Sequence, residues 1–213
     1  WGDGSALEAG LLGNASHEYA VAGEYNIEIT GEFPQIFIDN GPDKDKILSI
    51  EQWGNINWST FQNSFLGCSN LVINATDTPN LSGVLFMGAM FSGASSLVDN
   101  GGNMANWDVS NVVNMSSVFQ DAEAFNAAIG SWDVSSVKDM RLLFAGTNVF
   151  NQDIGAWNVS NVTNMSGMFL NAPLFNQDIS GWNVTNVTLM NEMFSAANAF
   201  NQPIGRWKVA NVT

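Results

Sequence analysis

The chain has 213 residues, of which 46% are hydrophobic and 11% aromatic, a content that supports a packed core and excludes a disordered chain. With 20 acidic and 6 basic side chains its net charge is −14, and no basic run is present, which excludes nucleic acid and disfavours an anionic membrane as partner. One cysteine excludes an internal disulfide, and no apolar stretch of ~20 residues is available for direct membrane insertion.

Alternating apolar and polar residues mark the N-terminal segment. The alternation runs over residues 19–33, and a second short apolar run follows at Ile36-Phe37-Ile38. Period-two patterning is typical of half-buried β-strands. The phrase from His17 to Ile29 resembles the closing strands of PKD-type immunoglobulin-like modules. We therefore expect a β-rich cap over residues 1–46, because the first repeat of a stack needs its open apolar face covered.

A repeat of about 25 residues occupies residues 47–213. Met or Phe is followed by Phe four residues later, by a small residue three later, and by Phe or Leu three after that. One copy of this frame is Met165, Phe169, Ala172 and Phe175. About six copies fit, and we interpret the last as truncated at the C-terminus, where Thr213 falls partway through a repeat.

Each copy predicts one short helix and one short strand. Val162, Met165, Phe169 and Ala172 follow helical spacing, with Ser160 as a plausible N-cap. The segment from Phe175 to Trp182 is typical of a strand with its turn. Such units cannot bury their apolar faces alone and have to stack on their neighbours. The expected fold class is an α/β solenoid, a stack of short parallel strands and short helices behind the N-terminal cap.

Large aromatic residues return at three fixed positions of the period. We interpret them as a structural ladder that fills the same interior space in successive repeats. The alternative is an exposed row of tryptophans that stacks on sugar rings. The ladder comprises Trp107, Trp132, Trp157, Trp182 and Trp207; Phe119, Phe144, Phe169 and Phe194; and Phe125, Phe150, Phe175 and Phe200.

Polar residues also recur, and they provide the candidate surface positions for ligand binding: Gln152, Asp153, Gln177 and Asp178. Asp153 and Asp178 are expected to lie one above the other. A structural calcium ion bridging these carboxylates is one interpretation, and a solvated strand edge is the one that we favour. We expect no other metal and no cofactor.

Two segments resemble a known family. Phe65-Leu-Gly-Cys-Ser-Asn-Leu71 is similar to the F-x-G-C-x-x-L segment of BspA-type leucine-rich repeats, and the block from Phe150 to Met165 is similar to the 25-residue variant found in BspA-like surface proteins and mycoplasma lipoproteins. The resemblance implies a leucine-rich-repeat-like solenoid. It also implies a bacterial cell-surface or secreted protein that binds a protein ligand on a host or neighbouring cell.

No catalytic constellation is visible in the sequence. The single histidine, His17, lies outside the repeat, and Cys68 occupies a position that small residues fill in other copies. No glycine-rich phosphate loop and no serine elbow occurs. We therefore expect a recognition or adhesion module and not an enzyme. The alternatives are a passive spacer in a larger surface protein and a glycan-binding module. The sequence does not define the oligomeric state.

Overall fold

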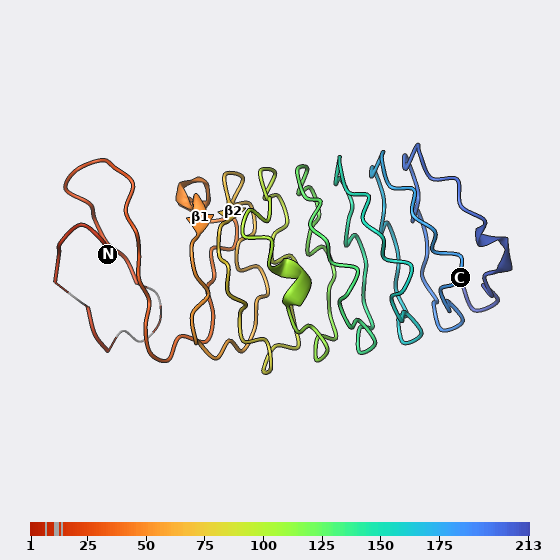
Figure 1. The fold of residues 1–213 in the computed structure, drawn as a ribbon, viewed down its shortest axis with the longest axis horizontal. Helices are drawn as coiled ribbons and strands as arrows, with labels where there is room; N and C mark the ends of the chain where they lie inside the picture. The colour runs from red at the N-terminus through yellow and green to blue at the C-terminus, as the bar shows by residue number, and fades with distance from the viewer. Residues whose placement is uncertain (7, 11–12, 14) are drawn as a thin grey trace.

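The computed structural model describes residues 1–6, 8–10, 13 and 15–213. Most of the chain forms irregular loops that follow one another along the long axis of the molecule, so that segments one repeat apart lie side by side (Figure 1). The strands β1 and β2 pair in parallel, with Ser49 opposite Val72 and Ile50 opposite Ile73. The regular elements are short: η1 (Lys44–Lys46), β1 (Ser49–Ile50), β2 (Val72–Ile73), η2 (Met104–Asn106) and η3 (Ile204–Arg206).

The predicted α/β solenoid is wrong, and so is the leucine-rich-repeat-like stack of strands and helices. The described part of the chain contains no α-helix, and its one sheet has two strands of two residues each. Elsewhere strand-like pairing is limited to isolated parallel bridges, such as Asn114 with Asp139. The backbone explains why the helix fails. Gly167 and Asn171, inside the predicted helix, have φ angles of 60° and 53°, which a right-handed helix cannot contain.

Successive β-turns replace the predicted helix in each repeat. In the copy that begins at Met115, the N–H groups of Val118 and Ala122 donate to the carbonyl oxygens three residues earlier, at 3.4 and 3.1 Å. Ser117 and Asp121, the third residues of these turns, have φ angles of 57° and 55°, as type II turns require. Positive φ recurs at the same two positions in the other copies, at Asn63, Gly67, Ala89, Gly93, Leu142, Gly146, Gly167, Asn171, Glu192 and Ala196.

Backbone hydrogen bonds join these turns to the next repeat. The N–H groups of Met115, Ser117, Phe119 and Asp121 donate to carbonyl oxygens of the following copy at 2.7 to 3.0 Å. The copies that begin at Met87, Met140 and Met165 make the same four bonds. We call these bonds the turn ladder. They pair backbone groups that would otherwise lie unsatisfied between packed repeats, without forming continuous strands.

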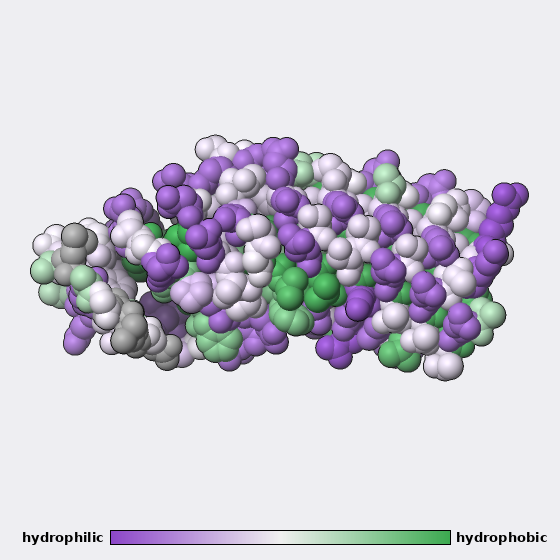
Figure 2. Space-filling model, turned by 90° about the horizontal axis from the view of Figure 1, so that it is seen from below, coloured by the Kyte–Doolittle hydropathy of each residue, from purple (hydrophilic) through white to green (hydrophobic). Residues whose placement is uncertain are grey.

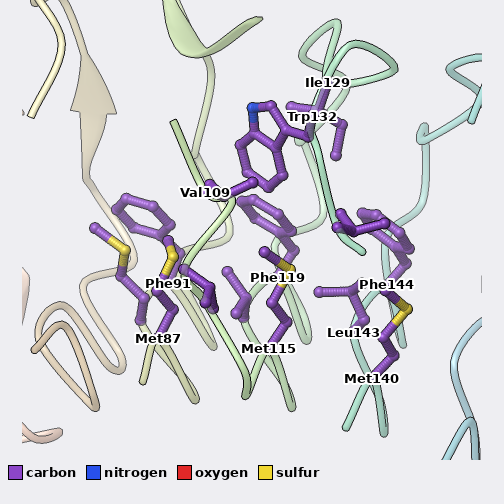
Figure 3. Close-up of a cluster of buried hydrophobic side chains, with 14 of the residues drawn as sticks. Met87, Phe91, Val109, Met115, Phe119, Ile129, Trp132, Met140, Leu143 and Phe144 are labelled. Atoms are coloured by element: carbon purple, nitrogen blue, oxygen red, sulfur yellow. The ribbon is translucent and has the colours of Figure 1, made fainter. Parts of the chain in front are cut away.

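The aromatic residues of the predicted ladder lie in the interior of the stack, except at its C-terminal end, where Phe194, Phe200 and Trp207 are partly buried. Trp107, Trp132, Trp157 and Trp182 are each 4% exposed. Figure 3 shows Phe91, Phe119 and Phe144 in one row, with Trp132 packed above them; the rings of this row are 6.0 and 5.8 Å apart. A second row of Phe125, Phe150, Phe175 and Phe200 stacks at 5.8 to 6.1 Å. The core is therefore continuous from repeat to repeat.

The indoles of Trp132, Trp157, Trp182 and Trp207 each find a hydrogen-bond partner in the preceding repeat, whereas the buried Nε1–H groups of Trp53 and Trp58 have none among the described residues. The Nε1–H of Trp132 donates to the carbonyl of Met104 at 2.8 Å, and that of Trp157 donates to the carbonyl of Ile129 at 3.2 Å. A buried indole N–H without a partner would be costly, so these bonds fix both the ring and the spacing of the repeats.

The predicted β-rich cap is also wrong in its secondary structure. Of residues 1–46, those that the structure describes form no strand and only the short turn η1; residues 7, 11, 12 and 14, which belong to the predicted cap, lie outside the described residues. The last part of this segment nevertheless covers the first repeat. The N–H of Ile38 donates to the carbonyl of Ser64 at 3.0 Å, and that of Asn40 to the carbonyl of Leu66 at 2.9 Å.

Candidate binding surface

The glutamines predicted as surface candidates form hydrogen bonds that join one repeat to the next. The Nε2 of Gln152 donates to both the carbonyl and the Oδ1 of Asn126, at 3.1 and 3.0 Å. Gln177 makes the same pair of bonds to Asn151, each at 2.9 Å. Each asparagine Oδ1 also accepts the backbone N–H of the asparagine in the next repeat. We call the row Asn126, Asn151, Asn176 and Asn201, with Gln152, Gln177 and Gln202, the amide ladder.

The aspartates predicted as surface candidates cap their own turns. The Oδ1 of Asp153 accepts the N–H of Gly155, and that of Asp178 accepts the N–H of Ser180, both at 2.9 Å. Hydrogen bonds from Ser180, first from its side chain and then from its backbone, lower the pKa of the Asp178 carboxyl. Within the described residues no group of three or more His, Cys, Asp or Glu side chains gathers where it could hold a metal ion.

Further polar rows are used in the same internal way. The Nδ2 groups of Asn161 and Asn186 donate to carbonyl oxygens of the preceding repeat at 2.8 and 2.7 Å. The Oγ1 groups of Thr163 and Thr188 do likewise at 3.1 and 3.2 Å. Many of the recurring polar side chains on this surface therefore hold the repeats together, because they are already hydrogen-bonded to groups within the chain.

Apolar side chains remain exposed between these polar rows. Val149 is 40% exposed and Leu174 is 52% exposed, and they occupy the same position in adjacent repeats. We call these two side chains the apolar row. Leu142 and Leu170 lie half-buried over the turns of the same repeats, and both are close to Gly167: a Cβ built on that glycine would be 2.6 Å from Leu142 Cδ2 and 3.6 Å from Leu170 Cβ. Figure 2 shows one face of the molecule, on which polar side chains dominate and apolar surface gathers between them.

The surface of the described residues includes two hollows. One of about 530 Å³ lies at the C-terminal end, lined in part by Phe194 and Trp207, and one of about 320 Å³ lies beside η2, lined in part by Ala105 and Ala127. Each contains a single acidic residue and no histidine or cysteine. Ser195 and Glu192 both line the hollow at the C-terminal end, but among the described residues no hydrogen bond joins their side chains.

The histidine His17 and the cysteine Cys68 lie apart from both hollows. His17 Nε2 is 2.8 Å from Asp3 Oδ2. Hydrogen bonds from Ser5 and, next, from His17 lower the pKa of Asp3. The carboxylate thus lies between the serine and the imidazole, and no hydrogen bond joins His17 to Ser5 among the described residues. Burial raises the pKa of the Cys68 thiol to about 12, so this cysteine is a poor nucleophile.

Sequence reasoning missed the apolar row. The sequence contains a signal for this row: Val149 and Leu174 stand at the position of the repeat where the neighbouring copies have Ala124 and Ala199. Larger apolar residues at a position that the fold leaves exposed are not required for packing. The period is defined by the residues that recur, and Val149 and Leu174 depart from it.

Comparison with known proteins matches the chain to one family model. The model, described as "Mycoplasma protein of unknown function, DUF285", matches residues 59–160 and 127–213. No curated protein and no solved structure matches the chain. The matched model does not mention leucine-rich repeats, so the BspA-like resemblance stays a prediction. No helix within the described residues is long and apolar enough to cross a membrane.

Proposed function

The chain belongs to the DUF285 family, a bacterial family described from mycoplasma, and we propose that it is a recognition and adhesion module that binds a protein ligand. We further propose that it acts at the cell surface or after secretion, where it would meet a ligand on a host or neighbouring cell, as its BspA-like resemblance implies. The proposal includes no catalytic activity.

The apolar row is the observation that carries this proposal. Interfaces that bind proteins have an apolar centre within a polar rim. Val149 and Leu174 supply such a centre, and the amide ladder and turn ladder hold their repeats in fixed relative positions. A rigid surface loses little conformational entropy on binding, which favours affinity. The net charge of −14 favours a ligand with a basic rim around its own apolar patch.

A passive spacer is the second candidate, and the polar rows favour it. Their hydrogen bonds run from repeat to repeat and make the stack cohesive without any ligand. A glycan-binding module receives less support, because four of the five ladder tryptophans, Trp107, Trp132, Trp157 and Trp182, are only 4% exposed and offer no ring face to a sugar.

A binding comparison tests the proposal. The chain is incubated with intact animal cells and with immobilised extracellular-matrix proteins, and saturable binding is measured for the wild type and for the double variant Val149→Ser with Leu174→Ser. We expect the double variant to bind at least about tenfold more weakly, since two apolar contacts are lost. Binding of the wild type should also weaken as salt increases, because charges between solvent-exposed partners are screened.

The matched control is the double variant Leu85→Ser with Val209→Ser, whose side chains are 46% and 47% exposed but lie in other repeats. This control should bind as the wild type does. Absence of saturable wild-type binding to every cell and protein tested, or an equal loss in both double variants, would contradict the proposal and leave the spacer as the better account.

A further inference from the structure

The hollow of about 320 Å³ beside η2 continues the line of the apolar row. Ala124, which lines this hollow, occupies the position that Val149 and Leu174 occupy in the next two repeats. The phenylalanines that directly follow these three residues stack on one another at 5.8 and 6.1 Å. The hollow and the two exposed apolar side chains therefore belong to one continuous strip of surface that crosses three repeats.

Small side chains keep this hollow open. Ala127 and Ala128 stand where the two following repeats have glutamine and aspartate, and Val98 stands where those repeats have an asparagine of the amide ladder. At the equivalent place, Gln152 and Gln177 reach back and donate to the asparagine one repeat earlier. An alanine cannot make that contact. The hollow is therefore a local departure from the repeat, with alanine methyl groups as its floor.

The carboxylate of Asp99 forms the charged part of the wall. Its Oδ1 and Oδ2 accept the N–H groups of Asn103 and Met104 at 3.4 and 3.0 Å, which holds the carboxylate at the start of η2. An ionised carboxylate can accept about four hydrogen bonds, so these two leave acceptor capacity for a ligand. Asp99 is partly exposed, and a ligand in the hollow can therefore reach it.

No basic side chain from this part of the chain neutralises the hollow. Residues 47–137, which include all the residues that line it, contain seven acidic side chains and no lysine, arginine or histidine. A carboxylate of a ligand would be repelled here, and a neutral side chain would gain no ionic attraction from Asp99. Charge complementarity therefore favours a cationic occupant.

Among cationic side chains, arginine matches the hollow best. Its long methylene stem can cover the alanine floor while its charged head stays at the polar wall. The planar guanidinium forms two parallel hydrogen bonds with a carboxylate such as that of Asp99, whereas the ammonium of lysine acts as a point charge.

We propose that this hollow receives an arginine side chain of the protein ligand whose apolar residues contact Val149 and Leu174. The inference rests on the proposed binding function and adds to it a position that selects the ligand. In an extended ligand, side chains on one face lie about 7 Å apart, close to the 5.8 and 6.1 Å between the stacked rings of these repeats. Two apolar residues and one arginine at alternate positions therefore reach Leu174, Val149 and the hollow together.

A pair of short peptides tests the inference. One is acetyl-Leu-Ser-Leu-Ser-Arg-Ser-amide, and its partner has citrulline in place of arginine, which keeps the shape and removes the charge. Each is also made in reverse order, so that both chain directions are sampled. Binding is followed by nuclear magnetic resonance shifts of Ala124, Ala127 and Val149. We expect the arginine peptide to bind at least about threefold more tightly than the citrulline peptide, because only the former forms an ion pair with Asp99.

Variants of the chain locate the effect. Ala127→Gln fills the hollow with the side chain that the following repeats have at this position, and it should bind both peptides equally. The matched control is Ala210→Gln, which places the same side chain at an exposed position outside the hollow and should keep the difference between the peptides. The double variant Val149→Ser with Leu174→Ser should weaken both peptides to the same extent.

Three outcomes would overturn the inference: equal affinity of the two peptides for the wild type, a difference that persists in Ala127→Gln, or no saturable shift with any peptide. The proposed function is decided separately by the comparison on cells and matrix proteins. If the double variant Val149→Ser with Leu174→Ser loses binding there while the peptides show no preference for arginine, the apolar row binds the ligand and the hollow does not select it.

Discussion

Glycine at position 130 allows two repeats to approach each other, and its replacement by alanine should separate them. A Cβ built on Gly130 would lie 2.2 Å from the carbonyl oxygen of Asp153 in the next repeat, where ordinary contact begins at 3.4 Å. The obstacle is backbone and cannot rotate away, so the repeats have to open by about 1.2 Å at this point. Overpacking of this kind costs about 1 to 3 kcal/mol of folding free energy. For a chain of this size the midpoint of thermal unfolding should fall by roughly 3 to 10 °C.

Thermal unfolding followed by circular dichroism measures this effect, and Gly181→Ala is the matched control. A Cβ at Gly181 would meet no atom within 4 Å, and Ser131 and Ala156 occupy the same position in other repeats. The control should therefore change the free energy of unfolding by less than about 0.5 kcal/mol. If Gly130→Ala and Gly181→Ala unfold at the same temperature, close approach of the two backbones at Gly130 does not limit stability and the reasoning fails.

Three further predictions concern single side chains. Trp157→Phe removes the indole bond to the carbonyl of Ile129 and should lower the free energy of unfolding by about 1 to 3 kcal/mol in urea titrations. Cys68, whose pKa burial raises to about 12, should resist iodoacetamide at pH 8.5 in the native chain and react after unfolding, as mass spectrometry would show. Hydrogen bonds from Ser135 lower the pKa of Asp133, so its stabilising contribution is present above the ordinary carboxyl pKa and is lost as pH falls through the lowered one. Carboxyl titration by nuclear magnetic resonance should show this lowered pKa, and Ser135→Ala should raise it.

The period of the sequence is sufficient to predict which residues pack together, but not the backbone that carries them. An aromatic side chain that returns every 25 residues has to occupy equivalent surroundings in each repeat, and the rings of Phe119, Phe144 and Phe169 do stack in one row. Spacings of four and three residues suggested a helix. Successive β-turns produce the same spacing, since each turn also returns its first and fourth residues to the same side of the chain.

The residues with positive φ were the signal that distinguishes turns from a helix. Glycine, aspartate and asparagine recur at one of the two positive-φ positions of the repeat, as Gly67, Gly93, Asp121, Gly146 and Asn171. These are the residue types that best tolerate left-handed backbone. The second such position is harder to recognise, because it contains side chains as unsuited to that conformation as Leu142 and Glu192. There the four hydrogen bonds of the turn ladder impose a conformation that the local sequence does not favour.

The sequence does not reveal the chemistry of the candidate surface positions. Gln152 and Gln177 do lie on the outside of the stack, yet their amide groups are bound to the preceding repeat. A sequence pattern cannot distinguish an exposed side chain that is free from one whose hydrogen bonds are already made. That distinction depends on the distance between neighbouring repeats, which the backbone turns determine.

Residues that do not recur are the ones able to encode a specific partner. A side chain that joins two repeats has to repeat, because its bonding partner lies at the equivalent position one copy away; Asn151 with Gln177 is an example. Such positions look alike along the whole stack and cannot mark one place on it. Val149, Leu174 and Arg141 break the pattern of their positions and are exposed. Discrimination between ligands requires local differences in shape and charge, and on this surface only positions of this kind can supply them.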